Sequence, residues 1–158
     1  MKKVTALVIA GAFACSSLAY AESETEKEVK QTILESSEYI NKNLKGRSDD
    51  YSQHGALEFW SSGGLLQEIA PTGRPGEFEA VNIQTKHIKV ITLVEGQAAV
   101  AHFYSEGSFK HKGSPAVNHY VTRVTQVFVK EEGKWKVRSA HWSPVTGGSG
   151  TTQTAQEQ

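Results

Sequence analysis

The sequence predicts an α+β domain in which one long N-terminal helix covers one face of a curved, cone-shaped antiparallel sheet. Two observations lead to this fold class. Apolar residues recur at helical spacing over residues 29–44, and four long segments in the second half of the chain have the composition of strands. A sheet that wraps over a helix leaves an open mouth, so we also expect a ligand pocket.

The expected helix is amphipathic and about five turns long. Its apolar residues follow one another at intervals of four, seven and four, at Val29, Ile33, Ile40 and Leu44. At about 100° per residue, these side chains fall in one narrow stripe, which is typical of a helix packed on one side. Gly46 is expected to end the helix.

The middle of the chain is less regular. Residues 56–61 predict a short strand, and a Gly-Gly pair follows it. Residues 71–76 contain two prolines and two glycines, which predict a loop. Periodicity does not distinguish strand from helix in residues 65–70 or residues 78–85, so both segments stay open.

The second half of the chain predicts two hairpins. Residues 88–94 and 97–105 form the first, and residues 109–115 are expected to be a loop. The last hairpin spans residues 120–143 and turns at residues 131–134. Alternation in its second strand predicts two faces, one with Trp135, Val137, Ser139 and His141, the other with Lys136, Arg138, Ala140 and Trp142.

The two ends of the chain are expected to lie outside the domain, which takes up residues 22–145. Residues 1–21 contain a lysine pair, an apolar run and a final Ala-Tyr-Ala, which are typical of a signal peptide cut before Glu22. The apolar run is too short for the alternative, a membrane anchor. Residues 146–158 lack large apolar side chains and predict a disordered tail. We therefore expect a periplasmic or secreted protein.

Composition narrows the class of partner. Without the signal peptide the chain keeps 15 basic and 17 acidic residues, a net charge of −2. That charge excludes the basic surface typical of a nucleic-acid binder, and no second apolar run is long enough to cross a membrane. The only cysteine, Cys15, lies in the signal peptide. The six histidines show neither His-x-His nor His-Glu-x-x-His spacing, so we expect no metal and no cofactor.

The last hairpin also carries a family resemblance. Gly-Lys-Trp-Lys-Val at residues 133–137, followed by His141-x-Ser143, resembles the C-terminal signature of the nuclear transport factor 2-like superfamily. The resemblance extends over residues 28–143 and is nearest to SnoaL-like proteins and to the association domain of calcium/calmodulin-dependent protein kinase II. It implies a cone-shaped fold, and this superfamily includes isomerases, dehydratases, cyclases, assembly domains and binding proteins.

One departure from these relatives bears on the ligand. The kinase association domain has pocket arginines that bind carboxylates, and the matching positions here are Ser105, Gln126 and Trp142. An amide and an indole ring do not replace a bidentate guanidinium. The resemblance therefore implies a small ligand that is mostly apolar or weakly polar.

A second departure bears on catalysis. Tyr39 and Gly46 reproduce the spacing of the catalytic tyrosine in ketosteroid isomerase, but residues 59–61 hold no carboxylate where that enzyme has its base. The only aspartates of the chain, Asp49 and Asp50, are adjacent in a polar segment. We expect them to lie in solvent, not to form a tuned acid–base pair.

The expected pocket wall combines aromatic and polar side chains of the helix and the sheet. These are Tyr39, Trp60, His102, Tyr104, Gln126, His141 and Trp142. His102 and Tyr104 are included because they form a polar pair on an otherwise apolar strand face. Arg123 and Gln126 lie on opposite faces of a regular strand, and the sequence leaves open which of them faces the cavity.

Three functions stay open, and we favour the first. It is a noncatalytic protein that binds a small molecule in the cone. The second is an isomerase, dehydratase or cyclase with His102 or His141 as general base and Tyr39 as hydrogen-bond donor. The third is an assembly module. All three are compatible with a homodimer built on an outer sheet face, whose expected residues are Val121, Thr125, Val127 and Val129.

Overall fold

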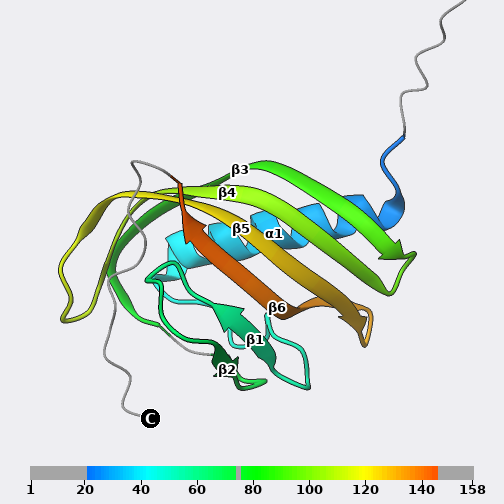
Figure 1. Ribbon diagram of the computed structural model, residues 1–158, viewed down its shortest axis with the longest axis horizontal. Coiled ribbons are helices and arrows are strands. Elements are labelled where there is room, and N and C mark those ends of the chain that lie inside the picture. The colour runs from blue at the N-terminus through cyan, green and yellow to red at the C-terminus, as the bar shows by residue number, and fades with distance from the viewer. Residues whose placement is uncertain (1–20, 74–75, 146–158) are drawn as a thin grey trace, which may run out of the picture.

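The computed structural model describes residues 21–73 and 76–145, which form a helix and a six-stranded sheet (Figure 1). The elements in chain order are α1 (Glu24–Asn43), β1 (Ala56–Phe59), β2 (Gln67–Ile69), β3 (Phe78–Val94), β4 (Ala98–His111), β5 (Val117–Glu131) and β6 (Lys134–Pro144). The sheet order is β2-β1-β6-β5-β4-β3, and the sheet is curved and unclosed. The expected α+β class is therefore confirmed. The expected tail, and the expected signal peptide up to residue 20, lie outside the described residues.

A capping box begins α1. The Ser23 hydroxyl accepts a hydrogen bond from the Glu26 amide, and the Glu26 carboxylate accepts one from the Ser23 amide at 2.9 Å. One turn further on, the Glu28 carboxylate accepts from Lys130 at 2.6 Å and from the Trp135 indole at 2.8 Å. These contacts fasten the first half of the helix to the β5–β6 hairpin.

The helix ends before Gly46, the expected end. Leu44 adopts a left-handed conformation with a φ of 56°, and its amide donates to the Ile40 carbonyl at 2.9 Å. The Leu44 carbonyl then accepts from the Phe78 amide at 2.8 Å. This bond ties the end of α1 to the start of β3, and it offsets the roughly 1–2 kcal/mol that a left-handed conformation costs a non-glycine residue.

The expected apolar stripe packs against the inner face of the sheet at one end only. Val29 and Ile33 are buried there in one core cluster with Ala99, Ala101 and Phe128. Full burial of a large apolar side chain stabilises the fold by roughly 1.5–3 kcal/mol. Further along the helix, the stripe leaves this cluster and faces a cavity.

Strand β3 is longer than the sequence indicated. It begins at Phe78, so the segment 78–85 that was left open is a strand. His87 has a φ of 55°, and the pairing of β3 with β4 shifts between Lys86 and Lys89. This bulge bends the strand and adds to the curvature of the sheet. Residues 109–111, expected in a loop, belong to β4 instead.

The short strand β1 pairs with β6 in parallel, which the sequence did not indicate. Leu57 lies opposite Ser139 and Phe59 lies opposite His141. Strand β2 then pairs with β1 in antiparallel orientation, at the edge of the sheet. The sheet is therefore mixed, and β1 and β2 form an arm that extends it beyond β6 (Figure 1).

A bulge in β6 changes which residues of this strand face inward. At this bulge, Val127 lies opposite Ser139 and the next residue, Phe128, lies opposite Val137. Arg138 therefore has no residue of β5 directly opposite it. Trp135 and Val137 are buried as expected. Beyond the bulge, however, Ala140 and Trp142 turn inward and His141 turns outward. The alternation predicted for this strand is therefore wrong after residue 137.

Gly107 on β4 provides a test of how closely β3 approaches β4. Its φ is 146°, and a Cβ atom there would lie 1.9 Å from the Asn82 carbonyl oxygen. We expect Gly107→Ala to lower the free energy of unfolding by about 2–4 kcal/mol, measured by urea denaturation. The control is Gly96→Ala, because Gly96 has a φ of 67° but open space around it. That change should cost only about 1 kcal/mol. Equal losses would contradict the close approach of β3 at Gly107.

Candidate functional site

A cavity of about 1560 Å³ lies between α1, the inner face of the sheet and the β1–β2 arm. It separates two groups of buried residues. One is the core cluster around Phe103 and Phe128, and the other is a smaller cluster of Phe109, Val117 and Tyr120. Both clusters contribute to its lining. The cavity therefore occupies the part of the cone that the helix leaves unfilled.

Aromatic rings form much of the cavity wall. Trp60 follows β1, and Trp142 enters from β6 after the bulge. The Trp142 ring meets Phe103 edge to face, with centroids 6.1 Å apart and planes at 88°. Tyr51 lines the same cavity. Such a wall suits the apolar body of a small molecule.

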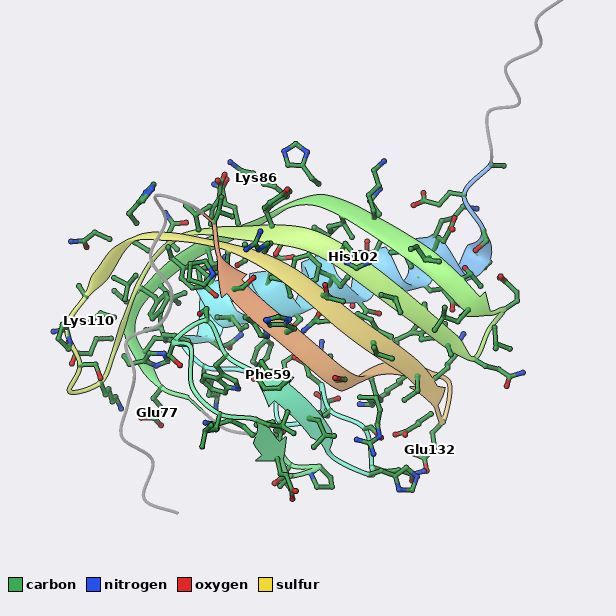
Figure 2. The ribbon with its side chains drawn as sticks, in the orientation of Figure 1. Phe59, Glu77, Lys86, His102, Lys110 and Glu132 are labelled. Atoms are coloured by element: carbon green, nitrogen blue, oxygen red, sulfur yellow. The ribbon has the colours of Figure 1, made fainter. Side chains whose placement is uncertain are left out.

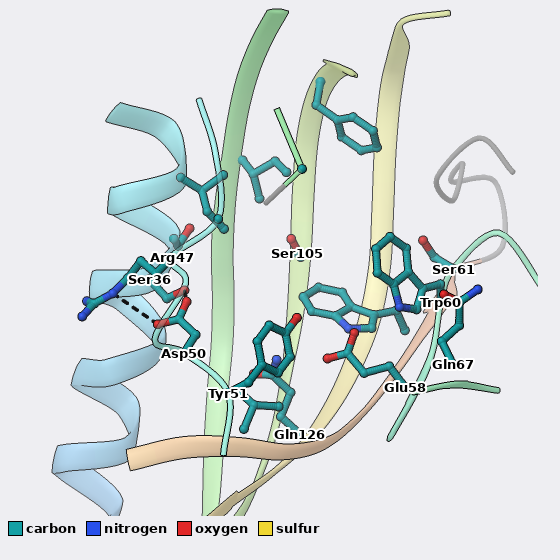
Figure 3. A pocket seen from close by; sticks show the side chains of 18 of the residues that line it. Ser36, Arg47, Asp50, Tyr51, Glu58, Trp60, Ser61, Gln67, Ser105 and Gln126 are labelled. Atoms are coloured by element: carbon teal, nitrogen blue, oxygen red, sulfur yellow. Dashed lines mark hydrogen bonds and ion pairs between the residues drawn. The ribbon is translucent and has the colours of Figure 1, made fainter. Parts of the chain in front are cut away.

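The helix side of the cavity carries an ion pair (Figure 3). The Ser36 hydroxyl donates to the Asp50 carboxylate at 2.7 Å, and the Arg47 guanidinium lies 3.3 Å from the same carboxylate. Burial raises the pKa of the Asp50 carboxyl, and the Ser36 hydrogen bond and the Arg47 charge only partly oppose it. For Asp49 the balance is reversed, because its hydrogen bond with Arg47 lowers its pKa. The expectation that both aspartates lie in solvent is therefore wrong for Asp50, whereas Asp49 is exposed.

Strand β1 brings a second carboxyl group into the cavity. Ala56 and Glu58 face inward and are buried, whereas Leu57 and Phe59 face outward and are exposed. Glu58 is only 3% exposed and lines the cavity. The segment 59–61 does lack a carboxylate, but the residue just before it supplies one. Glu58 and Trp60 are two residues apart, so they share a face of an extended segment. Because Trp60 was expected in the pocket wall, this spacing could have predicted that Glu58 lies there too.

The arm and the sheet also contribute neutral polar groups. Gln67 lies opposite Glu58 in the pairing of β1 with β2. Its Oε1 atom is buried and has no hydrogen-bond partner among the described residues. Gln126 and Ser105 line the sheet side of the cavity. In Figure 3, Gln67 lies on the side opposite Ser36 and Asp50, and Ser105 and Gln126 lie between the two sides.

Tyr120, His111 and Phe78 line another part of the cavity. The Tyr120 hydroxyl is hydrogen-bonded with Ser61 and Thr122, and burial raises its pKa despite those bonds. His111 stacks on Phe78, with ring centroids 4.4 Å apart. Burial lowers the pKa of His111, which favours its neutral form.

Three of the seven residues expected in the pocket wall line this cavity: Trp60, Gln126 and Trp142. Ser105, the third position of the relatives' arginines, lines it as well. The structure also answers the open question about β5, because Gln126 faces the cavity and Arg123 faces outward. The Arg123 guanidinium donates to the Ser143 hydroxyl at 2.9 Å, on the exposed side of the sheet.

The other four residues expected in the wall do not line the cavity. His102 and Tyr104 lie on the outer face of the sheet, where His102 meets the Thr125 hydroxyl at 3.0 Å and Tyr104 is 44% exposed. Figure 2 shows His102 on a strand that crosses in front of α1. The opposite face of β4 is the buried one. The polar pair therefore marks the solvent side of the strand.

His141 and Tyr39 are displaced for different reasons. The bulge in β6 turns His141 outward, where its ring meets Phe59 at 5.7 Å. Tyr39 lies on the flank of α1, and the Arg47 guanidinium covers its ring at 5.7 Å. Neither side chain lines the cavity.

The described residues contain neither a candidate metal site nor a candidate transmembrane helix. Within residues 21–73 and 76–145, no group of three or more His, Cys, Asp or Glu side chains is placed to hold a metal ion. The helix in the same part of the chain is not long and apolar enough to span a bilayer.

Comparison with known proteins shows similarity to solved structures only. No family model matches the sequence, and no curated protein matches it. Among solved structures, an NTF2-like protein of unknown function from Prochlorococcus has 21% identity and a TM-score of 0.53, over 83% of this chain and 96% of that one. A protein from Novosphingobium aromaticivorans, provisionally named a scytalone dehydratase, has 11% identity and a TM-score of 0.58, over 82% and 88%.

A third solved structure comes from Exiguobacterium sibiricum and is provisionally named a calcium/calmodulin-dependent kinase II association domain. It has 13% identity and a TM-score of 0.54, over 78% of this chain and 95% of that one. Identities this low show a common fold and leave the activity open. The helix, the curved mixed sheet and these similarities together show that the chain has the nuclear transport factor 2-like fold.

Proposed function

We propose that this chain is an exported protein that binds a small, mostly apolar or weakly polar molecule in the cavity between α1 and the sheet. The observation that carries the proposal is the cavity of about 1560 Å³, which Trp60 and Trp142 line together with polar side chains. Sites for small molecules are typically concave and mostly apolar, with about 300–1,000 Å³ of space. The cavity is large enough for such a ligand.

The positions of the two histidines expected as general bases favour binding over catalysis by either of them. His102 and His141, the expected general bases, lie on the outer face of the sheet. A general base must come within hydrogen-bond reach of the proton that it removes. A ligand inside the cavity is therefore out of reach of both imidazoles.

The proposal of export rests on the sequence of residues 1–21 alone. A charged start, an apolar run and the Ala-Tyr-Ala ending support it. N-terminal sequencing of protein recovered from the cell envelope or the medium tests it. A mature chain that begins at Glu22 supports export, and one that begins at Met1 contradicts it.

A second function, acid–base catalysis, is favoured by Asp50. Its carboxyl group lines the cavity, and burial raises its pKa, a shift that is common among carboxyl groups that act as an acid or a base. Glu58 supplies a second carboxyl group in the same cavity. The fold similarity to a protein named as a dehydratase is an analogy that points the same way.

We also propose a homodimer built on the outer face of the sheet. Ile91, Val100 and Val127 lie side by side on β3, β4 and β5, and Val94, Ala98 and Val129 form a second such row. Ile91 is 53% exposed and Val94 is 49% exposed. Neighbouring apolar side chains on an exposed sheet face are typical of a protein interface. Similarity in fold to a protein named as an association domain favours the same proposal.

Ligand binding is tested with a screen of phenols, apolar ketones and small carboxylates by thermal shift. We expect phenols and ketones to raise the melting temperature, with little dependence on salt. Trp142→Ala should weaken the affinity for a phenol by about fivefold or more, because it removes an aromatic wall. Tyr104→Ala is the matched control, since it removes an aromatic ring from the outer face. Stabilisation by carboxylates alone would contradict this view of the ligand.

The electrostatics behind the second function are tested by neutralising each aspartate. Burial raises the pKa of Asp50, so its charged form destabilises the native state, and Asp50→Asn should raise the free energy of unfolding at pH 7. The gain should disappear as the pH falls through the raised pKa. Asp49 has a lowered pKa, so Asp49→Asn should lower the free energy of unfolding at pH 7.

The loss caused by Asp49→Asn should disappear as the pH falls from about 4 through the lowered pKa. Urea denaturation between pH 3 and pH 8 measures both effects. A change of the same sign in the two variants at pH 7 would contradict the opposite environments of these carboxyl groups.

The dimer is tested by a charge in the middle of its apolar face. Val127→Lys should convert the dimer to a monomer in sedimentation velocity, because each copy would place a lysine opposite the apolar face of the other. Leu34→Lys is the control, since Leu34 is an apolar residue on α1 that is 41% exposed. It should leave the sedimentation coefficient unchanged. A dimer that survives Val127→Lys would exclude this interface.

A further inference from the structure

The β1–β2 arm buries an unpaired hydrogen-bond acceptor beside the cavity. Gln67 is the first residue of β2, and its side chain lines the cavity. Its Oε1 atom is buried and has no hydrogen-bond partner among the described residues. This amide oxygen has lost its bonds to water and has gained no other, which destabilises the folded protein. The free protein therefore holds an acceptor that a ligand could satisfy.

The pairing of the strands fixes where this acceptor lies. Gln67 of β2 lies opposite Glu58 of β1, which in turn lies opposite Ala140 of β6. Ala140 lies opposite Gln126 of β5. Residues that lie opposite one another project from the same face of a sheet, so this row of four residues faces inward. Gln67 and Gln126 are three strands apart, which corresponds to roughly 14 Å at about 4.8 Å per strand. In Figure 3, Gln67 lies on the arm side of the cavity and Gln126 lies between it and Asp50.

Aromatic rings stand on both sides of this row. Trp142 follows Ala140 by two residues on β6, and Phe128 follows Gln126 by two residues on β5. Because β5 and β6 are antiparallel, these two rings lie on opposite sides of the row. Both line the cavity. They supply apolar contacts to a ring-shaped body, and the carboxamide of Gln67 supplies a polar contact at the arm end of the row.

The unpaired oxygen distinguishes ligands by the hydrogen bond that they bring. A molecule with an N–H or O–H group can donate to it and so satisfy the buried acceptor. A ketone or an ether of the same shape leaves the oxygen unpaired and places a second acceptor near it. A site that hydrogen-bonds a ligand's N–H or O–H discriminates strongly against analogues that lack this group. The amide has no net charge with which to compensate a buried ion, so it suits a neutral donor.

We propose that Gln67 makes the cavity selective for neutral, ring-containing molecules with an N–H or O–H group, which donates to the Gln67 Oε1 atom. This inference rests on the proposed function, because it specifies the polar group of the mostly apolar ligand proposed above. The preferred class of ligand then contains phenols, indoles and similar cyclic donors. Ketones and ethers of the same size still bind through their apolar area, but more weakly.

Two ligands of nearly identical shape test the proposal by isothermal titration calorimetry at pH 7. Indole carries a ring N–H, and benzofuran has an oxygen atom in its place, so the pair differs in the donor and hardly in size. Both molecules are uncharged. We expect indole to bind about tenfold more tightly than benzofuran, because it alone can donate to the buried oxygen. This order in the unmodified protein tests the proposal even if a variant fails to fold.

Two variants locate the acceptor that matters. Gln67→Leu should abolish the preference for indole over benzofuran, because it replaces the carboxamide with an apolar group of similar size. Gln126→Leu is the matched control, since it makes the same change in the same row of the cavity. It should keep most of the preference. Gln67→Leu removes an acceptor that is unpaired in the free protein, so the melting temperature without ligand should not fall. Circular dichroism checks the fold of both variants.

The outcomes separate this inference from the function on which it rests. Equal binding of indole and benzofuran, or a preference that persists in a folded Gln67→Leu protein, overturns the role of Gln67 and leaves small-molecule binding supported. Loss of the preference in Gln126→Leu also overturns it, because the hydrogen bond is then not specific to Gln67. A lower melting temperature of ligand-free Gln67→Leu overturns the premise that its oxygen is unpaired. If neither molecule binds, both the inference and the proposed binding of ligands of this size are wrong.

Discussion

The structure depends on the contact between the first half of α1 and two alanines of β4. Val29 and Ile33 are buried against Ala99 and Ala101, whose small side chains permit the helix to lie close to the sheet. Further along, larger rings such as Phe103 and Phe109 project from the same strand face, and the sheet bends away. The end of the helix stays bonded to β3, and the space between the helix and the rest of the sheet is the cavity. The same packing that stabilises the domain creates its candidate site.

The sequence was sufficient for the helix and the long hairpins, because their signals are local. The stripe on α1 and the alternation in β4 and β5 each depend on residues close together in the chain. It was not sufficient for the parallel pairing of β1 with β6, which joins residues about 80 positions apart in the chain. The bulge at Arg138 leaves no local signal either, and it alone decides that Trp142 faces the cavity and His141 does not.

The candidate site shows the same division. Gln126 and Trp142 came from a family resemblance, and the structure places both in the cavity wall. Asp50 was expected in solvent and Glu58 was not expected in the wall, because a carboxylate in a polar segment or in a four-residue strand resembles ordinary surface charge in the sequence. Only the burial of each side chain distinguishes it, and burial depends on elements far away in the chain. The presence of these two carboxyl groups in the cavity is therefore a property of the tertiary structure.

The arm of β1 and β2 has a consequence for how this protein could diverge. It holds Glu58, Trp60 and Gln67 but joins the rest of the domain mainly through the pairing of β1 with β6. The buried clusters that stabilise the fold lie mostly on α1 and strands β3 to β6. Substitutions in the arm can thus exchange one ligand chemistry for another while the scaffold stays intact. Such a separation of recognition from stability lets one architecture acquire many specificities over evolutionary time.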